Sequence, residues 1–307
     1  EWVTTMSSEA GSIISNETRE RGSTYGQSWP ELLQNKGICQ ETLEEFSSKV
    51  LNFYDEQGRK FSWRSEISPY RVLVSEIMLQ QTQTGRVEEK FSAFVARFPG
   101  FQELAAADFS EVLRLWKGLG YNRRAKYLHD ISRTVVAEFD SALPDDPEIL
   151  VRFSGIGKAT AASICVFAFN KPYGFIETNI RTVFIHFFFP DQLGVSDPEI
   201  FVLVEKTMDS ENPRRWFYAL MDYGVMLKQT VGNLSRKSST YRKQSRFEGS
   251  DRQLRGRILD LLLSRTRVDV KTAAIILEQP EDRVRALTGA LYSEGLLVED
   301  NGWFKLA

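Results

Sequence analysis

Hydrophobic residues recur every three or four positions along much of the chain up to Gly232, which is the period of helices that bury one face. The pattern is clear between Leu43 and Tyr54 and returns in later segments. It predicts helices over residues 41–54, 70–83, 108–116, 122–139, 148–153, 195–208 and 214–227, with another that starts near Lys158. Strand signals are almost absent here. We therefore expect the first 230 residues to be mainly α-helical.

The last fifty residues follow a different pattern. They predict short helices over residues 254–263, 270–277 and 281–293, and then a β-hairpin whose turn is Asn301-Gly302. This order is typical of a winged-helix-like domain, which we place at residues 254–307. Arg283 and Arg285 fall on its third helix, which contacts DNA in many such modules. Other winged helices bind protein or pack on their own chain, so both roles stay open.

Two further segments differ from their surroundings in composition. Residues 1–30 are rich in Ser, Thr, Glu and Gly and poor in large apolar residues, which predicts a flexible N-terminal segment. Residues 233–253 form a basic linker: from residue 235 to 257 there are eight Lys or Arg and two acidic residues. Such a linker is either a solvated tether or a segment that binds along the phosphate backbone of DNA.

Composition narrows the class of protein. The chain of 307 residues is long enough for about two compact domains, and it has no run of about 18 apolar residues that would span a membrane. Its start shows no signal peptide. Cys39 and Cys165 are too few for a four-thiolate metal site or a disulfide framework. We therefore expect a cytoplasmic protein, associated with the nucleoid if the host is a prokaryote. With a net charge of −2, any nucleic-acid surface must be a local patch.

The segment from Leu150 to Ala162 contains Gly155-Ile156-Gly157-Lys158 between two predicted helices. Both glycines can take positive φ and let backbone N–H groups approach a phosphate. The helix that follows adds the positive end of its dipole, and Lys158 adds a charge. We therefore predict a helix-hairpin-helix that grips DNA, with Gly155, Gly157, Lys158 and Thr160 as contacts. Glu177 follows it in an apolar setting and is suited to stabilise positive charge.

On these residues the chain resembles the helix-hairpin-helix (HhH-GPD) DNA glycosylase superfamily, and within it the MutY-like adenine glycosylase branch. The most specific motif is the segment 69–83, PYRVLVSEIMLQQTQ. The motifs WKGLGY at 116–121 and MDYG at 221–224 are also similar to the family. The likeness covers roughly residues 41–230. It implies a two-lobed fold, with a six-helix lobe at 70–186 and a second helical lobe built from 31–69 and 187–232.

The resemblance also implies roles for single residues. Glu76 matches the glutamate that protonates the purine leaving group and helps to activate water. Glu177 stands where the family has an aspartate that stabilises the sugar cation, and Asn179 matches an asparagine beside it. Gln81 matches a wedge that enters the DNA stack beside the flipped base, while Gln80 and Tyr121 line the same region.

Three departures from the family pattern matter. No cysteine follows Gly224, so the iron–sulfur cluster of the family is not expected, and apolar packing by Trp216, Phe217 and Met226 is expected to close that lobe. Ala159 replaces the Schiff-base lysine of bifunctional relatives, which disfavours β-lyase activity by that route. The winged-helix-like domain stands where the family has a domain that checks for 8-oxoguanine, so recognition of adenine opposite 8-oxoguanine is not expected, and the base opposite the excised one is not predicted. No other cofactor is expected, although hairpin carbonyls near Phe153 and Ile156 can hold K⁺ or Na⁺, as in similar proteins.

The sequence therefore predicts a monomeric, monofunctional DNA N-glycosylase of base excision repair. It would act on double-stranded DNA with a lesion or mismatch and remove a mispaired or damaged base, with a purine such as adenine favoured. Glu177 adds one methylene, about 1.5 Å of reach, to the expected aspartate, and an error of about 1 Å can cost roughly 100-fold in rate. A non-catalytic, damage-sensing DNA-binding protein on the same fold is the alternative. A transcription regulator that binds DNA through residues 254–307 is a third reading.

Overall fold

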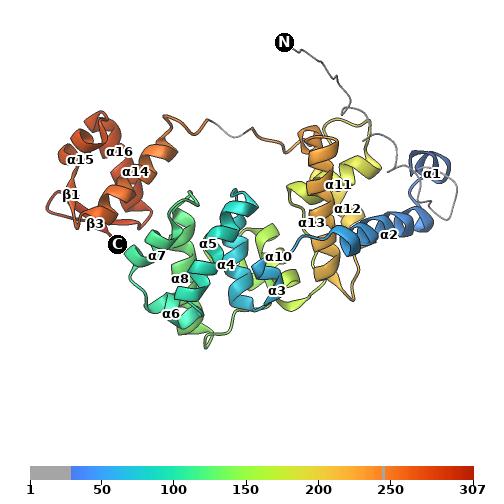
Figure 1. Ribbon diagram of the computed structural model, residues 1–307, viewed down its shortest axis with the longest axis horizontal. Coiled ribbons are helices and arrows are strands. Elements are labelled where there is room, and N and C mark those ends of the chain that lie inside the picture. Colours follow the sequence, from blue (N-terminus) through green and yellow to red (C-terminus); the bar gives the residue numbers. More distant parts are fainter. Residues whose placement is uncertain (1–28, 244–245) are drawn as a thin grey trace, which may run out of the picture.

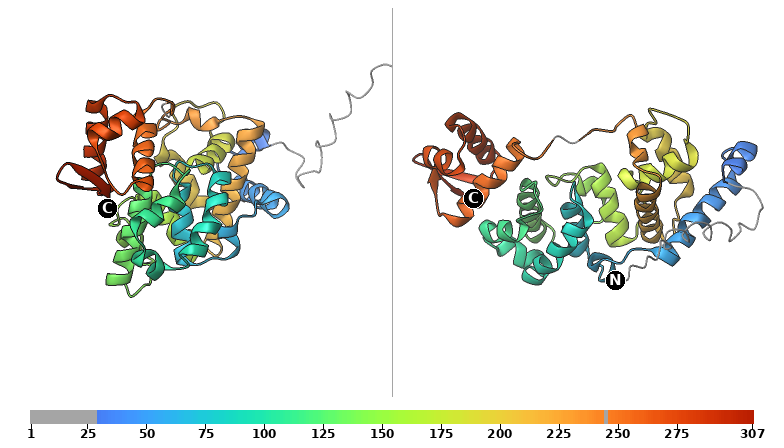
Figure 2. Two further views of the ribbon diagram at one scale, coloured as in Figure 1. Left: turned by 60° about the vertical axis from the view of Figure 1, so that its left-hand side comes forward. Right: turned by 45° about the horizontal axis from the view of Figure 1, so that its top comes forward.

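The computed structural model describes residues 29–243 and 246–307, which fold into two helical lobes and a smaller C-terminal module (Figure 1). The first lobe lies between the second lobe and the module (Figure 2). It contains α3 (Ser62–Ser65), α4 (Pro69–Leu79), α5 (Thr84–Arg97), α6 (Phe101–Ala106), α7 (Phe109–Trp116), α8 (Arg123–Glu138), α9 (Pro147–Leu150) and α10 (Lys158–Phe169). The second lobe contains α1 (Trp29–Lys36), α2 (Gln40–Gln57), α11 (Thr178–Phe188), α12 (Asp197–Thr207), α13 (Pro213–Thr230) and the 3₁₀ turn η1 (Leu234–Lys237). The predicted mainly α-helical fold is confirmed.

The predicted helices are all present, although some ends differ. Helix α4 ends at Leu79 rather than at Gln83, because the chain turns at Gln81, whose φ is 56°. The predicted helix over 148–153 is the single turn α9, after which the chain enters the hairpin. Helices α1, α5, α6 and α11 were not predicted. Residues 29–30 begin α1, and the rest of the predicted flexible segment lies outside the described residues.

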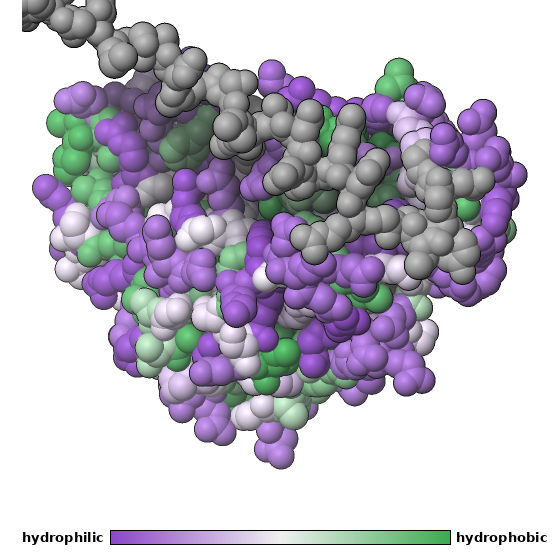
Figure 3. Space-filling view, turned by 45° about the vertical axis from the view of Figure 1, so that its right-hand side comes forward, coloured by the Kyte–Doolittle hydropathy of each residue, from purple (hydrophilic) through white to green (hydrophobic). Residues whose placement is uncertain are grey.

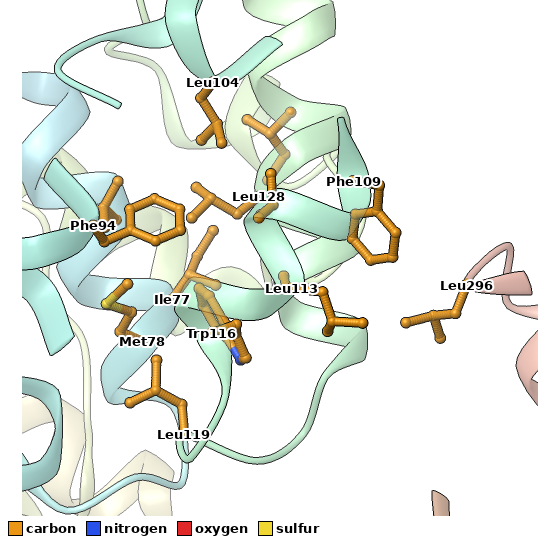
Figure 4. Close-up of a cluster of buried hydrophobic side chains, with 14 of the residues drawn as sticks. Ile77, Met78, Phe94, Leu104, Phe109, Leu113, Trp116, Leu119, Leu128 and Leu296 are labelled. Carbon is orange, nitrogen blue, oxygen red and sulfur yellow. The ribbon is translucent and has the colours of Figure 1, made fainter. Parts of the chain in front are cut away.

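Each lobe has its own apolar core. In the first lobe, Phe94, Trp116 and Leu128 are fully buried (Figure 4). In the second, the ring of Phe46 lies 5.0–5.8 Å from those of its aromatic neighbours Phe184, Phe187, Phe188 and Trp216. Trp216 and Phe217 are fully buried and Met226 packs at the edge, as expected of residues that close this lobe by apolar packing.

The structure places two segments in lobes other than those expected. Trp63 lies in the core of the first lobe, where its ring is 5.5 Å from that of Phe91, although residues 31–69 were assigned to the second lobe. Helix α11 packs in the core of the second lobe, although residues 70–186 were assigned to the first. The apolar side chains of α11, which include Val183 and Phe184, are what draw it into that core.

The C-terminal module consists of α14 (Asp251–Ser264), α15 (Val270–Leu277), α16 (Glu281–Ser293) and a sheet of β1 (Val268–Asp269), β2 (Leu297–Asp300) and β3 (Trp303–Leu306). The sheet order is β1-β3-β2, with both pairs antiparallel. The three helices and the hairpin at Asn301-Gly302 were predicted, whereas the two-residue β1 was not. The module packs on α7: Leu296 points toward Leu113, and Lys117 Nζ lies 3.2 Å from Asp260 (Figure 4).

Hydrophilic side chains predominate on the face shown in Figure 3, and hydrophobic ones form small separate groups. Among the described residues, no helix combines the length and apolar character needed to cross a membrane.

The two lobes are joined by an ion cluster at Asp222 on α13. The carboxylate of Asp222 is 2% exposed. It accepts hydrogen bonds from the backbone N and Nε of Arg59, both at 2.8 Å, and from both terminal nitrogens of Arg64, at 2.9 and 3.0 Å. Arg64 lies on α3 in the first lobe, so this cluster fixes α3 against α13.

Asp222→Asn should therefore lower the free energy of unfolding by about 3–5 kcal/mol, because it leaves two guanidinium groups without their anion in a buried place. Urea unfolding would measure this change. Asp55→Asn is the matched control: Asp55 pairs with Arg215 at the surface, where such a pair contributes about 0–1 kcal/mol. Equal losses in the two variants would contradict the proposed role of the cluster.

Candidate active site

A cavity of about 520 Å³ opens where the two lobes meet. Its lining comes from α4, α10, α13, the segment 59–64 and the start of α11. Three candidate catalytic residues, Glu76, Glu177 and Asn179, all line it. They are far apart in the sequence, and the fold brings them together as the resemblance implied.

Aromatic rings form part of the cavity wall. Phe61 and Trp63 stack with centroids 4.7 Å apart, and Phe167 and Tyr218 stack at 4.5 Å. The guanidinium of Arg64 lies 5.1 Å from the Phe61 ring and 4.2 Å from the Tyr218 ring, so it joins the two pairs. A wall of flat rings is suited to hold a planar base.

Glu76 is positioned by α4. This helix begins at Pro69, and the side chain of Ser68 caps it by accepting the N–H of Arg71 at 3.2 Å. Burial, and to a smaller extent the charge of Glu177, raise the pKa of Glu76 to about 7. The hydroxyl of Ser163 on α10 donates to Glu76 Oε2 at 2.5 Å and opposes this rise. Glu76 can therefore be a carboxylic acid near neutral pH.

Glu177 caps the N-terminus of α11. Its Oε1 accepts the backbone N–H groups of Asn179 at 2.7 Å and Ile180 at 2.9 Å. Its Oε2 accepts Asn179 Nδ2 at 3.2 Å. Burial raises the pKa of Glu177, while these N–H donors and the charge of Lys228 lower it. The net effect is still a raised pKa, but Glu177 has more donors that favour its anion than Glu76, which accepts one hydroxyl.

Several residues of the site were not predicted from the sequence. Lys228 on α13 lines the cavity, and its Nζ donates to Asn179 Oδ1 at 2.6 Å. Neither Ser163 nor Arg64 was among the predicted site residues. Asp222 lies inside the family-like motif 221–224, so that motif was the signal for an important position on α13.

A buried arginine, Arg124 on α8, connects the two loops that were expected to face DNA. Its Nη1 donates to three carbonyls at the end of α4, those of Ile77, Met78 and Gln80, at 2.8, 2.8 and 2.6 Å. Its Nη2 donates to the carbonyls of Leu119 and Gly120, at 3.2 and 2.9 Å. The loops that carry Gln81 and Tyr121 are thereby held side by side. Gln81 and Tyr121 both adopt a left-handed backbone conformation, with φ of 56° and 48°. Such backbone strain is common at functional sites.

The hairpin lies beside these loops. Gln80 Nε2 donates to the carbonyl of Gly155 at 3.1 Å and approaches Thr160 Oγ1 at 3.4 Å. Gly155 has φ +83°, and a Cβ there would lie 2.3 Å from the ring of Tyr127. Gly157 differs from the expectation: its φ is −88°, because it is the extended N-cap of α10. Lys158 begins α10 and is exposed.

The C-terminal module reaches one of these loops. Arg252 Nη1 donates to the hydroxyl of Tyr121 at 2.6 Å, and its guanidinium lies 5.3 Å from the Tyr121 ring. The two arginines of α16 lie away from the cavity. Arg283 binds Asp251, Gln279 and the carbonyl of Gly249, whereas Arg285 pairs with Glu281 and is largely exposed. Their contact with DNA stays a prediction.

Among residues 29–243 and 246–307, no three His, Cys, Asp or Glu side chains gather in a way that would hold a metal ion. At the hairpin, the carbonyl of Phe153 accepts the N–H of Ile156 at 3.1 Å, so one predicted ligand of K⁺ or Na⁺ is already part of the turn. An ion at this place stays a prediction.

Solved structures of DNA glycosylases share this fold. A thermostable thymine-DNA glycosylase matches with a TM-score of 0.56 and 24% identity, over 63% of this chain and 88% of that one. A trapped endonuclease III–DNA covalent intermediate matches with a TM-score of 0.52 and 14% identity, over 61% and 86%. The chain thus has the helix-hairpin-helix fold of these structures, with a cavity that holds two carboxyl groups next to the hairpin.

Sequence comparisons lead to the same class. Residues 74–200 match the family described as HhH-GPD superfamily base excision DNA repair protein. An adenine DNA glycosylase of Mycolicibacterium smegmatis is 32% identical over 283 residues, which are 84% of this chain and 95% of the relative. One of Mycobacterium tuberculosis is 32% identical over 235 residues, 70% and 77% of the two chains. The chain belongs to the HhH-GPD superfamily and, within it, to the MutY-like branch; it is a DNA glycosylase of base excision repair.

The two hairpin glycines should respond differently to alanine. Gly155→Ala combines positive φ with a clash against Tyr127, so it should cost about 1–3 kcal/mol of stability and displace the hairpin. Gly157→Ala meets nothing within 4 Å and should change stability by at most about 0.5 kcal/mol. Both should weaken binding to duplex DNA, Gly157→Ala because a Cβ keeps the phosphate away.

Thermal unfolding and fluorescence anisotropy with a duplex would separate the two effects. Gly85→Ala on α5, where nothing lies within 4 Å, is the control for both measurements. Unchanged DNA affinity in both hairpin variants would refute the predicted role of the hairpin.

Proposed function

We propose that this glycosylase is monofunctional and removes a mispaired or damaged purine, adenine above all, from double-stranded DNA. The observation that carries the proposal is the pair Glu76 and Glu177 in one cavity. Burial raises the pKa of both, but Glu76 accepts one hydroxyl, whereas Glu177 accepts two backbone N–H groups and one amide N–H that favour its anion. The relatives named adenine DNA glycosylase support adenine as the base.

The proposed reaction begins with a nucleotide that is flipped into the cavity between the aromatic pairs. Glu76 donates its proton to the base while the C1′–N bond breaks, so the base leaves as a neutral molecule. The positive charge that remains on the sugar is stabilised by the Glu177 carboxylate. Water then adds to C1′ and gives its proton to Glu76, which restores the acid.

Absence of a β-lyase step is proposed from the side chains near the sugar. Ala159 lines the cavity at the place where bifunctional relatives are expected to carry a lysine, and a methyl group cannot form an imine. Lys158 is exposed at the start of α10. Lys228 lines the cavity but is hydrogen-bonded to Asn179.

The proposal also includes the setting of the enzyme. In the proposed reaction, the side chain of Glu76 carries out each proton transfer. We therefore propose that the enzyme needs no cofactor and no iron–sulfur cluster. K⁺ or Na⁺ can bind at the hairpin in this proposal. We propose that it acts as a monomer, in the cytoplasm and on the nucleoid if the host is a prokaryote. The proposed DNA contacts are those of the hairpin, of Gln80, Gln81 and Tyr121, and of Arg283 and Arg285 in the module.

Base release should be measured on duplexes that carry adenine opposite guanine or 8-oxoguanine, and also uracil, thymine, hypoxanthine or oxidised bases. Mass spectrometry would identify the product. We expect adenine to be released without cleavage of the strand. Tight binding without release of any base would instead support a damage-sensing protein.

The rate of excision should fall as the pH rises through about 7, by about tenfold per pH unit, because the protonated form of Glu76 is lost. Ser163→Ala removes a hydrogen bond that lowers the pKa of Glu76, so this alkaline limb should move to higher pH. Single-turnover rates across pH would measure both effects.

Ser132→Ala is the control for that shift, since Ser132 is equally buried and its hydroxyl donates to the carbonyl of Leu128 within α8. A rate that does not depend on pH between 6 and 8.5, or an equal shift in both serine variants, would count against Glu76 as the acid.

Substitutions of Glu177 should separate the effect of its negative charge from the effect of its side-chain length. Glu177→Gln removes the anion and should slow excision by about 100- to 1000-fold. Glu177→Asp keeps the anion, and Asp caps helices well, but the carboxylate moves by about 1 Å, so a loss of up to about 100-fold is expected. Single-turnover rates at one pH test whether excision slows from wild type to Glu177→Asp and further to Glu177→Gln. Unfolding temperatures are the control that the variants are folded. A Glu177→Gln enzyme as fast as wild type would remove Glu177 from the mechanism.

A further inference from the structure

Lys228 reaches the active site because α11 and α13 approach closely at one point. A Cβ built on Gly224 would lie 2.4 Å from the carbonyl oxygen of Asn179, so only glycine permits this contact. Lys228 follows Gly224 by one helical turn and therefore lies on the same face of α13. Its ammonium is half-buried and lines the cavity.

A chain of hydrogen bonds connects this ammonium with the catalytic carboxylate. Lys228 Nζ donates to Asn179 Oδ1 at 2.6 Å, and Asn179 Nδ2 donates to Glu177 Oε2 at 3.2 Å. An ammonium group has only donors, so it can pair only with the oxygen end of the amide. It thus fixes which end of Asn179 faces Glu177, and a reversed amide would place its oxygen against the carboxylate.

We propose that Lys228 is a positioning residue for base excision: through Asn179 it holds the second oxygen of Glu177 in place. The proposal rests on the hydrolytic function proposed above. Glu has one more rotatable bond than Asp, so its carboxylate needs an additional constraint to keep one position. The N–H groups of Asn179 and Ile180 fix Oε1, and the relay from Lys228 fixes Oε2.

The charge of Lys228 acts in the same direction. Among the charged groups near Glu177, Lys228 and Arg181 lower its pKa. Arg181 is also paired with Asp197, at 2.8 Å. Burial lowers the pKa of Lys228; of the nearby charges, Glu177 raises it and Arg59 lowers it. Loss of the ammonium should therefore raise the pKa of Glu177 and move the acid limb of the rate profile to higher pH.

The test compares single-turnover excision of adenine from a duplex with adenine opposite guanine or 8-oxoguanine, across pH. Lys228→Met should lose about 10- to 100-fold in rate, with little change in affinity for the same duplex, and its acid limb should shift upward. Lys228→Arg keeps the charge and should recover part of the loss. Gln229→Met, exposed on the next position of α13, should behave as wild type.

A double-mutant cycle tests the route through Asn179. Asn179→Ala alone and Asn179→Ala with Lys228→Met should excise at similar rates, because the amide through which Lys228 acts is already gone. Independent, multiplied losses would overturn the proposal, as would full activity of Lys228→Met. If wild type releases no base, the proposed function fails and this role fails with it.

Borohydride trapping on a duplex with a preformed abasic site separates positioning from covalent chemistry, because it needs no base excision. A positioning lysine predicts no trapped complex with wild type. A trapped complex that disappears in Lys228→Met would show that the amine attacks the sugar, and the proposal would be wrong.

Discussion

The proposed mechanism depends on keeping two carboxyl groups in different charge states within one buried cavity. Burial raises the pKa of both, and the charge of Glu177 raises that of Glu76 further. The difference comes from their partners. Glu76 accepts one hydroxyl from Ser163, whereas Glu177 accepts two backbone N–H groups and one amide N–H. An acid and an anion can therefore coexist at the same pH, as removal of a base with an oxocarbenium-like sugar requires.

The acid and the anion belong to different lobes, so catalysis depends on how these lobes are held. Glu76 lies on α4 of the first lobe, and Glu177 lies at the start of α11 in the second. Two features fix the distance between them. The Asp222 cluster ties α13 to α3, and the close contact at Gly224 ties α13 to α11. Helix α13 thus contacts elements on both sides of the site, and a shift of this helix would move Glu177 relative to Glu76.

The sequence predicted the residues proposed for catalysis better than their surroundings. Glu76, Glu177 and Asn179 were found because each lies in a local motif, and the structure brings them into one cavity. Lys228 and Ser163 reach the site only through the packing of whole helices, which periodicity cannot show. The end of α4 was predicted too late because Gln81 adopts a left-handed backbone conformation, and Arg124, from a different helix, helps to stabilise that turn. Both hairpin glycines were predicted to permit positive φ, and only Gly155 adopts it; a glycine pair alone does not reveal which one forms the turn.

The glutamate at position 177 is compatible with a well-ordered site because the additional methylene is absorbed locally. Asp, Ser, Thr and Asn are the usual N-caps, and their short side chains reach the N2 and N3 amides directly. Glu177 reaches the same two amides with one oxygen, so its longer side chain must fold back over the start of α11. The second oxygen then points along Asn179 toward Lys228. A longer carboxylate is thus held by one helix cap and one cation, and the position of α13 decides whether that cation is present.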